Sequence, residues 1–166
     1  MLKPIFMRSG ASEPPATYHP QSYTPHEFSL CVRVISGMNL PKENGDKQGE
    51  VIDPCVTVDL QCSTGTVQTK TTASIRKNGY NPIWDELFEF KIKNLDFSIL
   101  CFTVYDVDFL KPDYIAHGGV CVKNLREGYR FVPIVDAQGV AIRDSGLLCH
   151  FELKQPHRPP PVTARQ

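Results

Sequence analysis

Large apolar residues occupy every second position in several short stretches of this chain. In FSLCVRV, which begins at Phe28, alternate residues are large and apolar. In LFEFKIK, the apolar residues Phe88, Phe90 and Ile92 alternate with charged ones. Because successive side chains of a β-strand point to opposite faces, a period of two indicates strands with one face buried and one face in water.

Similar stretches recur along most of the chain and are separated by turn residues. No window of helical length carries an apolar stripe with a period of 3.6 residues. About eight short strands at even spacing therefore predict an all-β fold, an antiparallel eight-stranded β-sandwich. After the strand that begins at Phe28, strands are expected at residues 54–61, 67–73, 86–93, 98–105, 114–122, 129–135 and 147–153.

The length of 166 residues suits one folded domain with flanking segments. Residues 11–26 contain four prolines among small and polar residues, which indicates an extended linker. We therefore expect the folded domain at residues 27–155. The proline-rich, basic residues 156–166 are predicted to be a disordered tail, and a proline-rich ligand for an aromatic groove is the alternative.

Composition narrows the class of partner. The chain has 18 basic and 18 acidic residues, so its net charge of zero argues against nucleic acid and other polyanions bound by bulk charge. Its six cysteines are scattered without metal-ligand spacing and are interpreted as small core residues in a reducing compartment. No apolar run reaches the ~18 residues of a membrane span, and the apolar start is too short for a secretory signal. We predict a cytoplasmic protein that is peripheral on membranes.

Candidate chemistry concentrates in two acidic segments, NGDKQGEVIDP at residues 44–54 and YDVDFLKPD at residues 105–113. Asp106 and Asp108 are two apart at the end of a predicted strand, so their side chains leave the same face. Clustered carboxylates repel one another, and a hard divalent cation removes that cost. Calcium accepts six to eight oxygen ligands at ~2.3–2.6 Å and tolerates irregular geometry, so it is the expected ion.

An ordinary structural role remains the alternative for each aspartate taken alone. Aspartates at strand ends commonly form turns or bind nearby backbone amides. The D-x-D pair with Asp113 five residues further on favours the metal site, provided that the first acidic segment lies beside it.

Three separated motifs carry a family resemblance: VIDP at 51–54, NPIWDELFEF at 81–90 and YDVD at 105–108. In order and spacing they resemble the C2 domain family, which implies a C2-type β-sandwich that binds phospholipid with calcium. The stretches ISGMNLPK and LREGYRFVPI are similar to the C2 domain of eukaryotic phosphoinositide-specific phospholipase C, delta-like forms in particular. The opening MLKPIFMR is similar to the end of the catalytic barrel of those enzymes, so residues 1–10 are interpreted as a remnant of that barrel.

The resemblance implies a calcium-ligand set. Lys77 departs from the delta pattern, because it stands where an asparagine often helps to bind the ion, which leaves the number of calcium ions open. The implied ligands are Asp53, Asp106, Asp108, Asp113, the backbone carbonyl of Val51, and Asn44 or Asp46.

Beside these ligands, Phe109 and Leu110 follow the D-x-D directly and are predicted to insert into a membrane. Packing back onto the sandwich is the alternative. Basic residues are predicted to meet anionic headgroups around this wedge, and a solvated basic rim is the equally weighted alternative. They are Lys70, Arg76, Lys77 and Lys111.

The predicted function is calcium-dependent phospholipid binding by the C2 module of a phospholipase C. The barrel of such an enzyme would hydrolyse phosphatidylinositol bisphosphate to inositol trisphosphate and diacylglycerol, and would be an intramolecular partner alongside anionic membranes. These residues contain no catalytic motif of their own, so we expect no hydrolysis from them alone. The alternatives are a calcium-independent scaffold and the end of a catalytically inactive phospholipase C-like adaptor.

Overall fold

The computed structural model describes residues 27–42, 51–63, 65–107 and 111–154. Within them the chain forms eight antiparallel strands and one short 3-10 helix, which confirms the predicted all-β fold. The predicted barrel remnant, linker and proline-rich tail lie outside the described residues. The elements are β1 (Phe28–Met38), β2 (Pro54–Gln61), β3 (Val67–Thr71), β4 (Ile83–Ile92), β5 (Ile99–Val107), β6 (Pro112–Cys121), η2 (Val122–Asn124), β7 (Gly128–Val135) and β8 (Ala141–Lys154).

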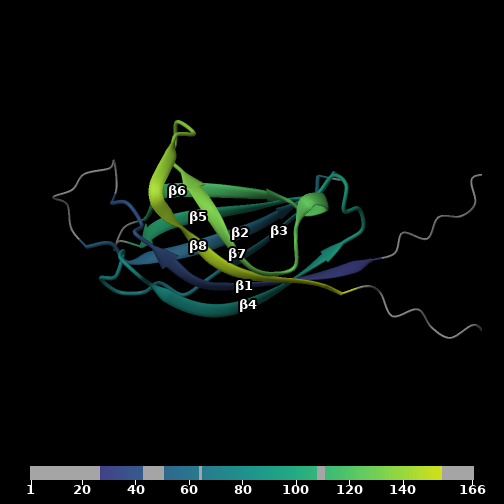
Figure 1. Cartoon of the computed structure of the whole chain (residues 1–166), viewed down its shortest axis with the longest axis horizontal. Coiled ribbons are helices and arrows are strands. Elements are labelled where there is room, and N and C mark those ends of the chain that lie inside the picture. Colours follow the sequence, from purple (N-terminus) through teal and green to yellow (C-terminus); the bar gives the residue numbers. More distant parts are fainter. Residues whose placement is uncertain (1–26, 43–50, 64, 108–110, 155–166) are drawn as a thin grey trace, which may run out of the picture.

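The strands form two layers, as Figure 1 shows. Their hydrogen-bonded order is β3-β2-β5-β6-β7-β8-β1-β4, so each layer contains four strands and the layers meet between β6 and β7. That junction consists of one register pair, His117 with Val135. The chain therefore makes a sandwich by folding one sheet almost in half. None of the described helices is long and apolar enough to cross a membrane.

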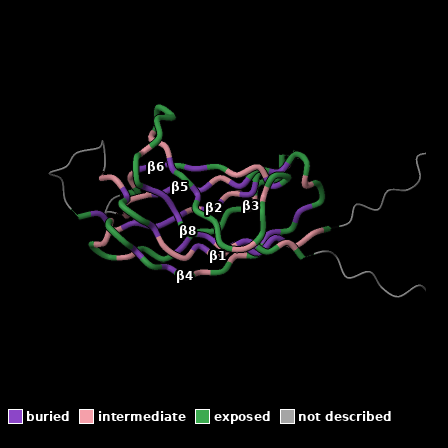
Figure 2. The backbone as a smooth tube through the Cα atoms, in the orientation of Figure 1, coloured by how far each residue is buried: buried purple, intermediate pink, exposed green. Residues whose placement is uncertain are grey.

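The core lies between the two layers and follows the predicted alternation. In β2, Val56, Val58 and Leu60 are fully buried. The rings of Phe102 in β5 and Phe151 in β8 meet edge to face across the sandwich, with their centroids 6.3 Å apart. Figure 2 shows buried positions alternating with exposed ones along most strands of both layers.

The two outer edges of the folded sheet, β3 and β4, are joined by a side chain instead of a backbone ladder. The Gln68 side-chain amide donates to the backbone carbonyl of Lys91 at 2.7 Å, and the Lys91 N–H donates to Gln68 Oε1 at 3.0 Å. Next to β3, the Ala73 N–H donates to Glu86 Oε1 of β4 at 2.8 Å. These contacts hold the two edges together where strand pairing is missing.

Strand boundaries agree with the prediction most closely in the core. β2 has the predicted bounds, whereas β4 begins three residues before the predicted residue 86 and β8 six residues before residue 147. The first half of β8 lacks regular alternation because Asp144 adopts a left-handed backbone with φ of 57° and the pairing with β7 is irregular between Pro133 and Val135. Because residues on both faces of this segment are largely exposed, its sequence lacks the apolar alternation that predicts a strand.

The cysteines are free thiols, three of them buried, as expected of core residues. Burial raises the pKa of Cys149 to about 12, so its thiol stays protonated at neutral pH. The buried cysteines are Cys31, Cys55 and Cys149.

Candidate calcium and membrane site

Asp53 and Asp106 lie side by side at one end of the sandwich. Pro54 of β2 is in register with Asp106 of β5, and the ladder continues beyond Pro54 because the Val107 N–H donates to the Asp53 carbonyl at 3.1 Å. The backbone N–H of Asp53 donates to Asp106 Oδ1 at 2.7 Å. The two acidic segments predicted from the sequence are therefore adjacent, as the metal hypothesis requires.

A β-bulge in β6 brings Asp113 opposite Asp106. Val104 pairs with Ala116, but Tyr105 pairs with Tyr114, so Ile115 is an extra residue on β6. Ile115 and Ala116 are consecutive and both buried, which breaks the alternation as a bulge does. Without this extra residue Asp113 would face Val107. With it, two carboxylates stand directly opposite on neighbouring strands, an arrangement that like charges disfavour.

The turn before β4 approaches the same place through its backbone. The N–H of Lys77 donates to Asp53 Oδ1 at 2.6 Å. Lys77 has a φ of 51°, in the left-handed region that glycine and asparagine tolerate better than lysine does. The Lys77 side chain is exposed, so the contact with Asp53 is made by the backbone alone. This turn, and with it Arg76, belongs to the aspartate end.

Within the described residues, only part of the predicted calcium-ligand set comes together. Carboxylate oxygens are the ligands that calcium prefers, and each carboxylate offers about four lone-pair sites, so one hydrogen bond leaves capacity for an ion. No group of three acidic, histidine or cysteine side chains in the described ranges is arranged to hold a metal. Val51 is described and exposed. The predicted ligands Asn44, Asp46 and Asp108 lie outside the described residues.

A cysteine next to the aspartates is not a ligand candidate. Burial raises the pKa of the Cys55 thiol, and the negative charge of Asp106 raises it further. Since the thiolate is the form that binds metals, Cys55 stays a protonated core residue at neutral pH.

Two buried contacts that the sequence reasoning missed hold the aspartate end in place. The carbonyl of Pro54 accepts hydrogen bonds from Trp84 Nε1 at 3.3 Å and from the Ile75 N–H at 3.0 Å. Trp84 is buried and lies in the NPIWDEL stretch of the family motif at residues 81–90. The one tryptophan of the sequence, within β4, is a signal for such a support, because its indole N–H needs a partner when buried.

Aromatic residues lie behind the aspartates on β5 and β6. Tyr105 and Tyr114 are register partners whose rings meet edge to face, with 6.5 Å between centroids. The Tyr114 hydroxyl lies 2.5 Å from Nδ1 of His117. Partial burial, then the nearby Asp136 carboxylate and Tyr105 phenol, raise the pKa of Tyr114. The Tyr114 phenol therefore stays neutral beside the carboxylates.

The structure places only some of the predicted membrane-contact residues at the aspartate end. Lys111 lies beside Asp113, with Nζ 3.7 Å from Oδ1, and its side chain is 78% exposed. Lys70 is exposed but pairs with Val58, four residues along β2 from Pro54, which is about 13 Å at the usual rise per residue. Lys70 is thus set back from the aspartate end. Phe109 and Leu110 lie outside the described residues.

Comparison with known proteins places this geometry in a family. The model of the C2 domain family matches residues 28–132. Human 1-phosphatidylinositol 4,5-bisphosphate phosphodiesterase delta-1 is 35% identical over 144 residues, which are 84% of this chain and 18% of that protein. Human inactive phospholipase C-like protein 2 is 31% identical over 125 residues, which are 75% of this chain and 11% of that protein.

A solved structure supports the architecture. A C2 domain of plant extended synaptotagmin 1 superposes with a TM-score of 0.64 at 22% identity, covering 78% of this chain and 96% of that domain. At this identity the likeness establishes the fold. The chain spans about a fifth of the length of the delta-1 relative, so most of that protein has no counterpart in it.

Proposed function

The chain belongs to the C2 domain family, and on that premise we propose that its aspartate end binds calcium and attaches the domain to anionic phospholipid membranes. The recognised resemblance to the C2 region of delta-type phosphoinositide phospholipases supports this assignment. The observation that carries it is the placement of Asp53, Asp106 and Asp113 on three neighbouring segments at one end of the sandwich.

The charges of this end support a cation-dependent mechanism. Asp106 and Asp113 are cross-strand partners, and Lys111, the basic side chain paired with Asp113, is mostly in water. An exposed ion pair of this kind contributes about 0–1 kcal/mol, so it compensates the repulsion poorly. A bound calcium ion would add positive charge at this end and could share its coordination with a lipid phosphate.

The protein's own residues then determine how the domain meets the membrane. The Lys77 N–H donates to one carboxylate oxygen of Asp53, and the Asp53 N–H donates to one carboxylate oxygen of Asp106. These hydrogen bonds fix the orientation of both carboxylates. The exposed Arg76, Lys77 and Lys111 would each add about 1 kcal/mol against anionic headgroups. Phe109 and Leu110 complete the proposed contact as apolar residues next to the ligands.

For a longer protein built like the delta-1 relative, we extend the proposal to targeting of an enzyme. That relative is a phosphodiesterase of phosphatidylinositol 4,5-bisphosphate by name. The C2 domain would hold the hydrolytic part at a membrane that contains its substrate, where hydrolysis would release inositol trisphosphate into the cytoplasm and leave diacylglycerol in the membrane. The present residues would supply attachment and orientation, and no catalytic group.

Sedimentation with vesicles tests the proposal. We expect the domain to pellet with phosphatidylserine-containing vesicles in calcium and to remain in the supernatant in chelator. The double variant Asp53→Asn, Asp106→Asn keeps the hydrogen-bond acceptors but removes two charges, and it is expected to lower the calcium-dependent binding at least about tenfold. Asp96→Asn, which changes an exposed carboxylate paired with Lys123 in the turn before β5, is the matched control.

Equal pelleting with calcium and with chelator would contradict the proposal, as would normal binding by the double variant. The likeness to an inactive phospholipase C-like protein favours a second candidate, a calcium-independent interaction domain. Calorimetric titration separates the two, because the interaction domain needs no heat of calcium binding.

A further inference from the structure

The junction between β6 and β7 differs from every other strand pairing in the described sheet. β2 and β3 share five register pairs and β5 and β6 share nine, but β6 and β7 share one, His117 with Val135. Beyond that pair the strands diverge, and residues 128–134 run along β8 with no register partner in β6. Both β6 and β7 therefore present backbone edges to a gap that widens toward η2.

A hollow of about 220 Å³ lies in this gap between β6 and β7. Its apolar wall includes Val120 of β6, Val132 of β7 and the buried ring of Phe151. At the narrow end the strands touch: a Cβ on Gly118 would lie 2.7 Å from the Pro133 carbonyl oxygen. The hollow is thus narrow where β6 and β7 meet, and its lining includes Leu125 beyond the apolar wall.

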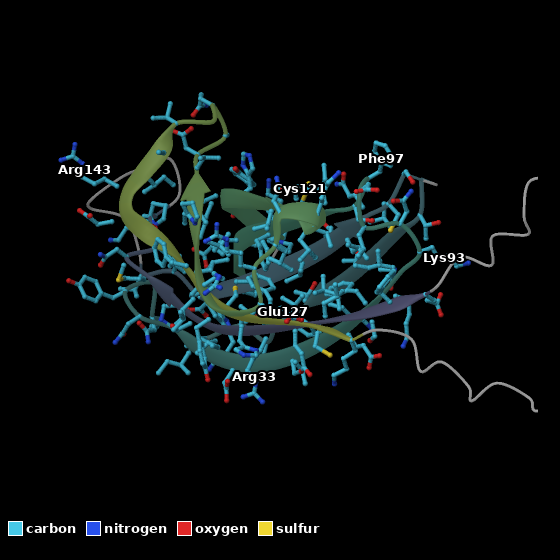
Figure 3. All side chains as sticks on the ribbon, turned by 45° about the vertical axis from the view of Figure 1, so that its right-hand side comes forward. Arg33, Lys93, Phe97, Cys121, Glu127 and Arg143 are labelled. Atoms are coloured by element: carbon cyan, nitrogen blue, oxygen red, sulfur yellow. The ribbon has the colours of Figure 1, made fainter. Side chains whose placement is uncertain are left out.

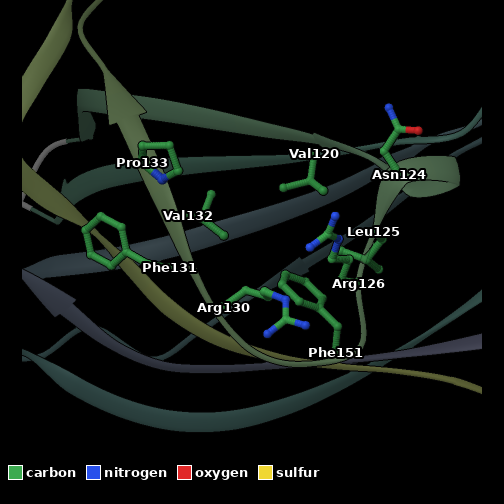
Figure 4. A pocket seen from close by; sticks show the side chains of 9 residues that line it. All are labelled: Val120, Asn124, Leu125, Arg126, Arg130, Phe131, Val132, Pro133 and Phe151. Atoms are coloured by element: carbon green, nitrogen blue, oxygen red, sulfur yellow. The ribbon is translucent and has the colours of Figure 1, made fainter.

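Two arginines stand over this apolar wall. Figure 4 shows the side chains of Arg126 and Arg130 turned toward the hollow near Phe151. Arg130 donates one hydrogen bond to the Tyr129 carbonyl at 2.6 Å, and Arg126 has no hydrogen bond or ion pair within the described residues. No acidic residue lines the hollow. In a chain of zero net charge, this places two guanidinium groups beside an apolar surface without a carboxylate.

We infer that this groove binds an extended acidic peptide segment of a partner protein, which adds a strand to the free edge of β7. An unpaired strand edge recognises a peptide through main-chain hydrogen bonds, and pockets for alternate side chains give specificity. Alternate residues of the added strand lie ~7 Å apart on one face. One apolar side chain would enter the hollow, with carboxylates two residues before and after it pairing with Arg126 and Arg130.

The groove favours a peptide over a lipid because of its backbone edges. A lipid tail offers neither donors nor acceptors for a strand, and a headgroup would use the arginines without the edge. The groove also involves none of the residues of the aspartate end. Peptide binding is therefore independent of the calcium proposal, and either can fail alone.

Fluorescence polarisation with defined peptides tests the inference on the full chain. The probe is a labelled seven-residue peptide in which threonines alternate with glutamate, leucine and glutamate. The matched peptide carries lysines for the glutamates, and a third carries N-methyl groups on the backbone. We expect the acidic peptide to bind at least about tenfold more tightly than either, in calcium and in chelator alike.

Charge reversal locates the site. The variant Arg126→Glu, Arg130→Glu is expected to lose at least about tenfold in affinity for the acidic peptide and to gain affinity for the basic one. Arg143→Glu, at the exposed start of β8 (Figure 3), removes the same kind of charge elsewhere and is expected to bind normally. In amide NMR spectra, the bound acidic peptide is expected to shift signals of β7 and to slow hydrogen exchange along its edge.

Any of four results would overturn the inference. The acidic and basic peptides could bind equally, the double charge reversal could leave binding unchanged, or the shifted amides could lie away from β6 and β7. Displacement of the peptide by phosphatidylserine vesicles in chelator would also overturn it and would assign the groove to lipid.

Discussion

The core and the aspartate end of this sandwich are built from the same strands but are held together differently. Between the layers, apolar side chains such as Phe102 and Phe151 are fully buried and touch across the sandwich. At the end of β2 and β5, Asp53 and Asp106 are half-buried, and each carboxylate accepts a hydrogen bond from a backbone N–H group. The core therefore consists of packed apolar side chains, whereas the aspartate end places carboxylates opposite one another.

The difference suggests that stability and ligand binding can be altered separately here. Burial of apolar side chains in the core contributes most of the favourable free energy of folding, about 25 cal/mol per Å² of apolar surface removed from water. The facing carboxylates of Asp106 and Asp113 oppose folding through like-charge repulsion, and the proposed calcium ion would offset that cost. A substitution in one region should therefore leave the other property nearly unchanged, which can be measured.

The largest effect is expected from the core. Phe102→Ala removes a fully buried ring that meets Phe151, and we expect the free energy of unfolding to fall by about 3–5 kcal/mol. Urea unfolding measures it. Phe97→Ala, at an exposed position, is the control and should stay within about 0.5 kcal/mol of the parent chain. A loss below about 1 kcal/mol for Phe102→Ala would contradict this picture of the core.

Calcium is expected to give the next largest effect, and only through the aspartate end. At a concentration of about 100 times the dissociation constant, a ligand of the folded state raises the free energy of unfolding by about 2.7 kcal/mol. The double variant Asp53→Asn, Asp106→Asn should lose this gain while unfolding in chelator within about 1 kcal/mol of the parent chain. Thermal unfolding with calcium and with chelator measures both. Retention of the full calcium gain by the variant would show that the ion binds elsewhere.

Two glycines of the sheet, Gly146 and Gly119, differ in how closely other atoms approach them. A Cβ on Gly146 would lie 2.4 Å from Phe131 Cζ and 2.6 Å from the Val132 carbonyl oxygen, so Gly146→Ala is expected to destabilise by about 1–3 kcal/mol. In Gly119→Ala the nearest atom would be 3.8 Å away, and no loss is expected. Equal unfolding midpoints in urea for the two variants would argue against close packing of Phe131 over β8.

The smallest effect is expected at the turn that contacts Asp53. Lys77→Asn places a residue that tolerates a left-handed backbone at φ of 51°, and a gain of about 0.5 kcal/mol in unfolding free energy is expected. Arg76→Asn, one residue earlier and also exposed, is the control and should give no gain. A destabilised Lys77→Asn variant would mean that the lysine side chain contributes more than its backbone does.

Much of the fold was predictable because the core strands repeat with period two. β2 was predicted with its bounds, since Val56, Val58 and Leu60 alternate cleanly with polar residues. The start of β8 was not predictable, because Asp144 interrupts alternation with a positive φ. Local periodicity reports burial on one face, and it fails where a strand is exposed on both.

The adjacency of the two acidic segments was predicted as a condition of the site, and the register of β2 and β5 meets it. The position of Asp113 was not predictable in this way. It depends on the extra residue Ile115, and a bulge leaves only two consecutive apolar residues in the sequence. The support of Pro54 by Trp84 likewise depends on a contact between segments 30 residues apart.

The glutamine that joins the outer edges bears on how this domain behaves in a crowded solution. Exposed strand edges are templates on which other chains can polymerise into fibrils. By binding both the N–H and the carbonyl of Lys91, Gln68 occupies hydrogen-bonding positions that a foreign strand would need on β4. We therefore expect one uncharged side chain to hinder self-assembly along this edge, while the gap beside β7 leaves a strand edge available.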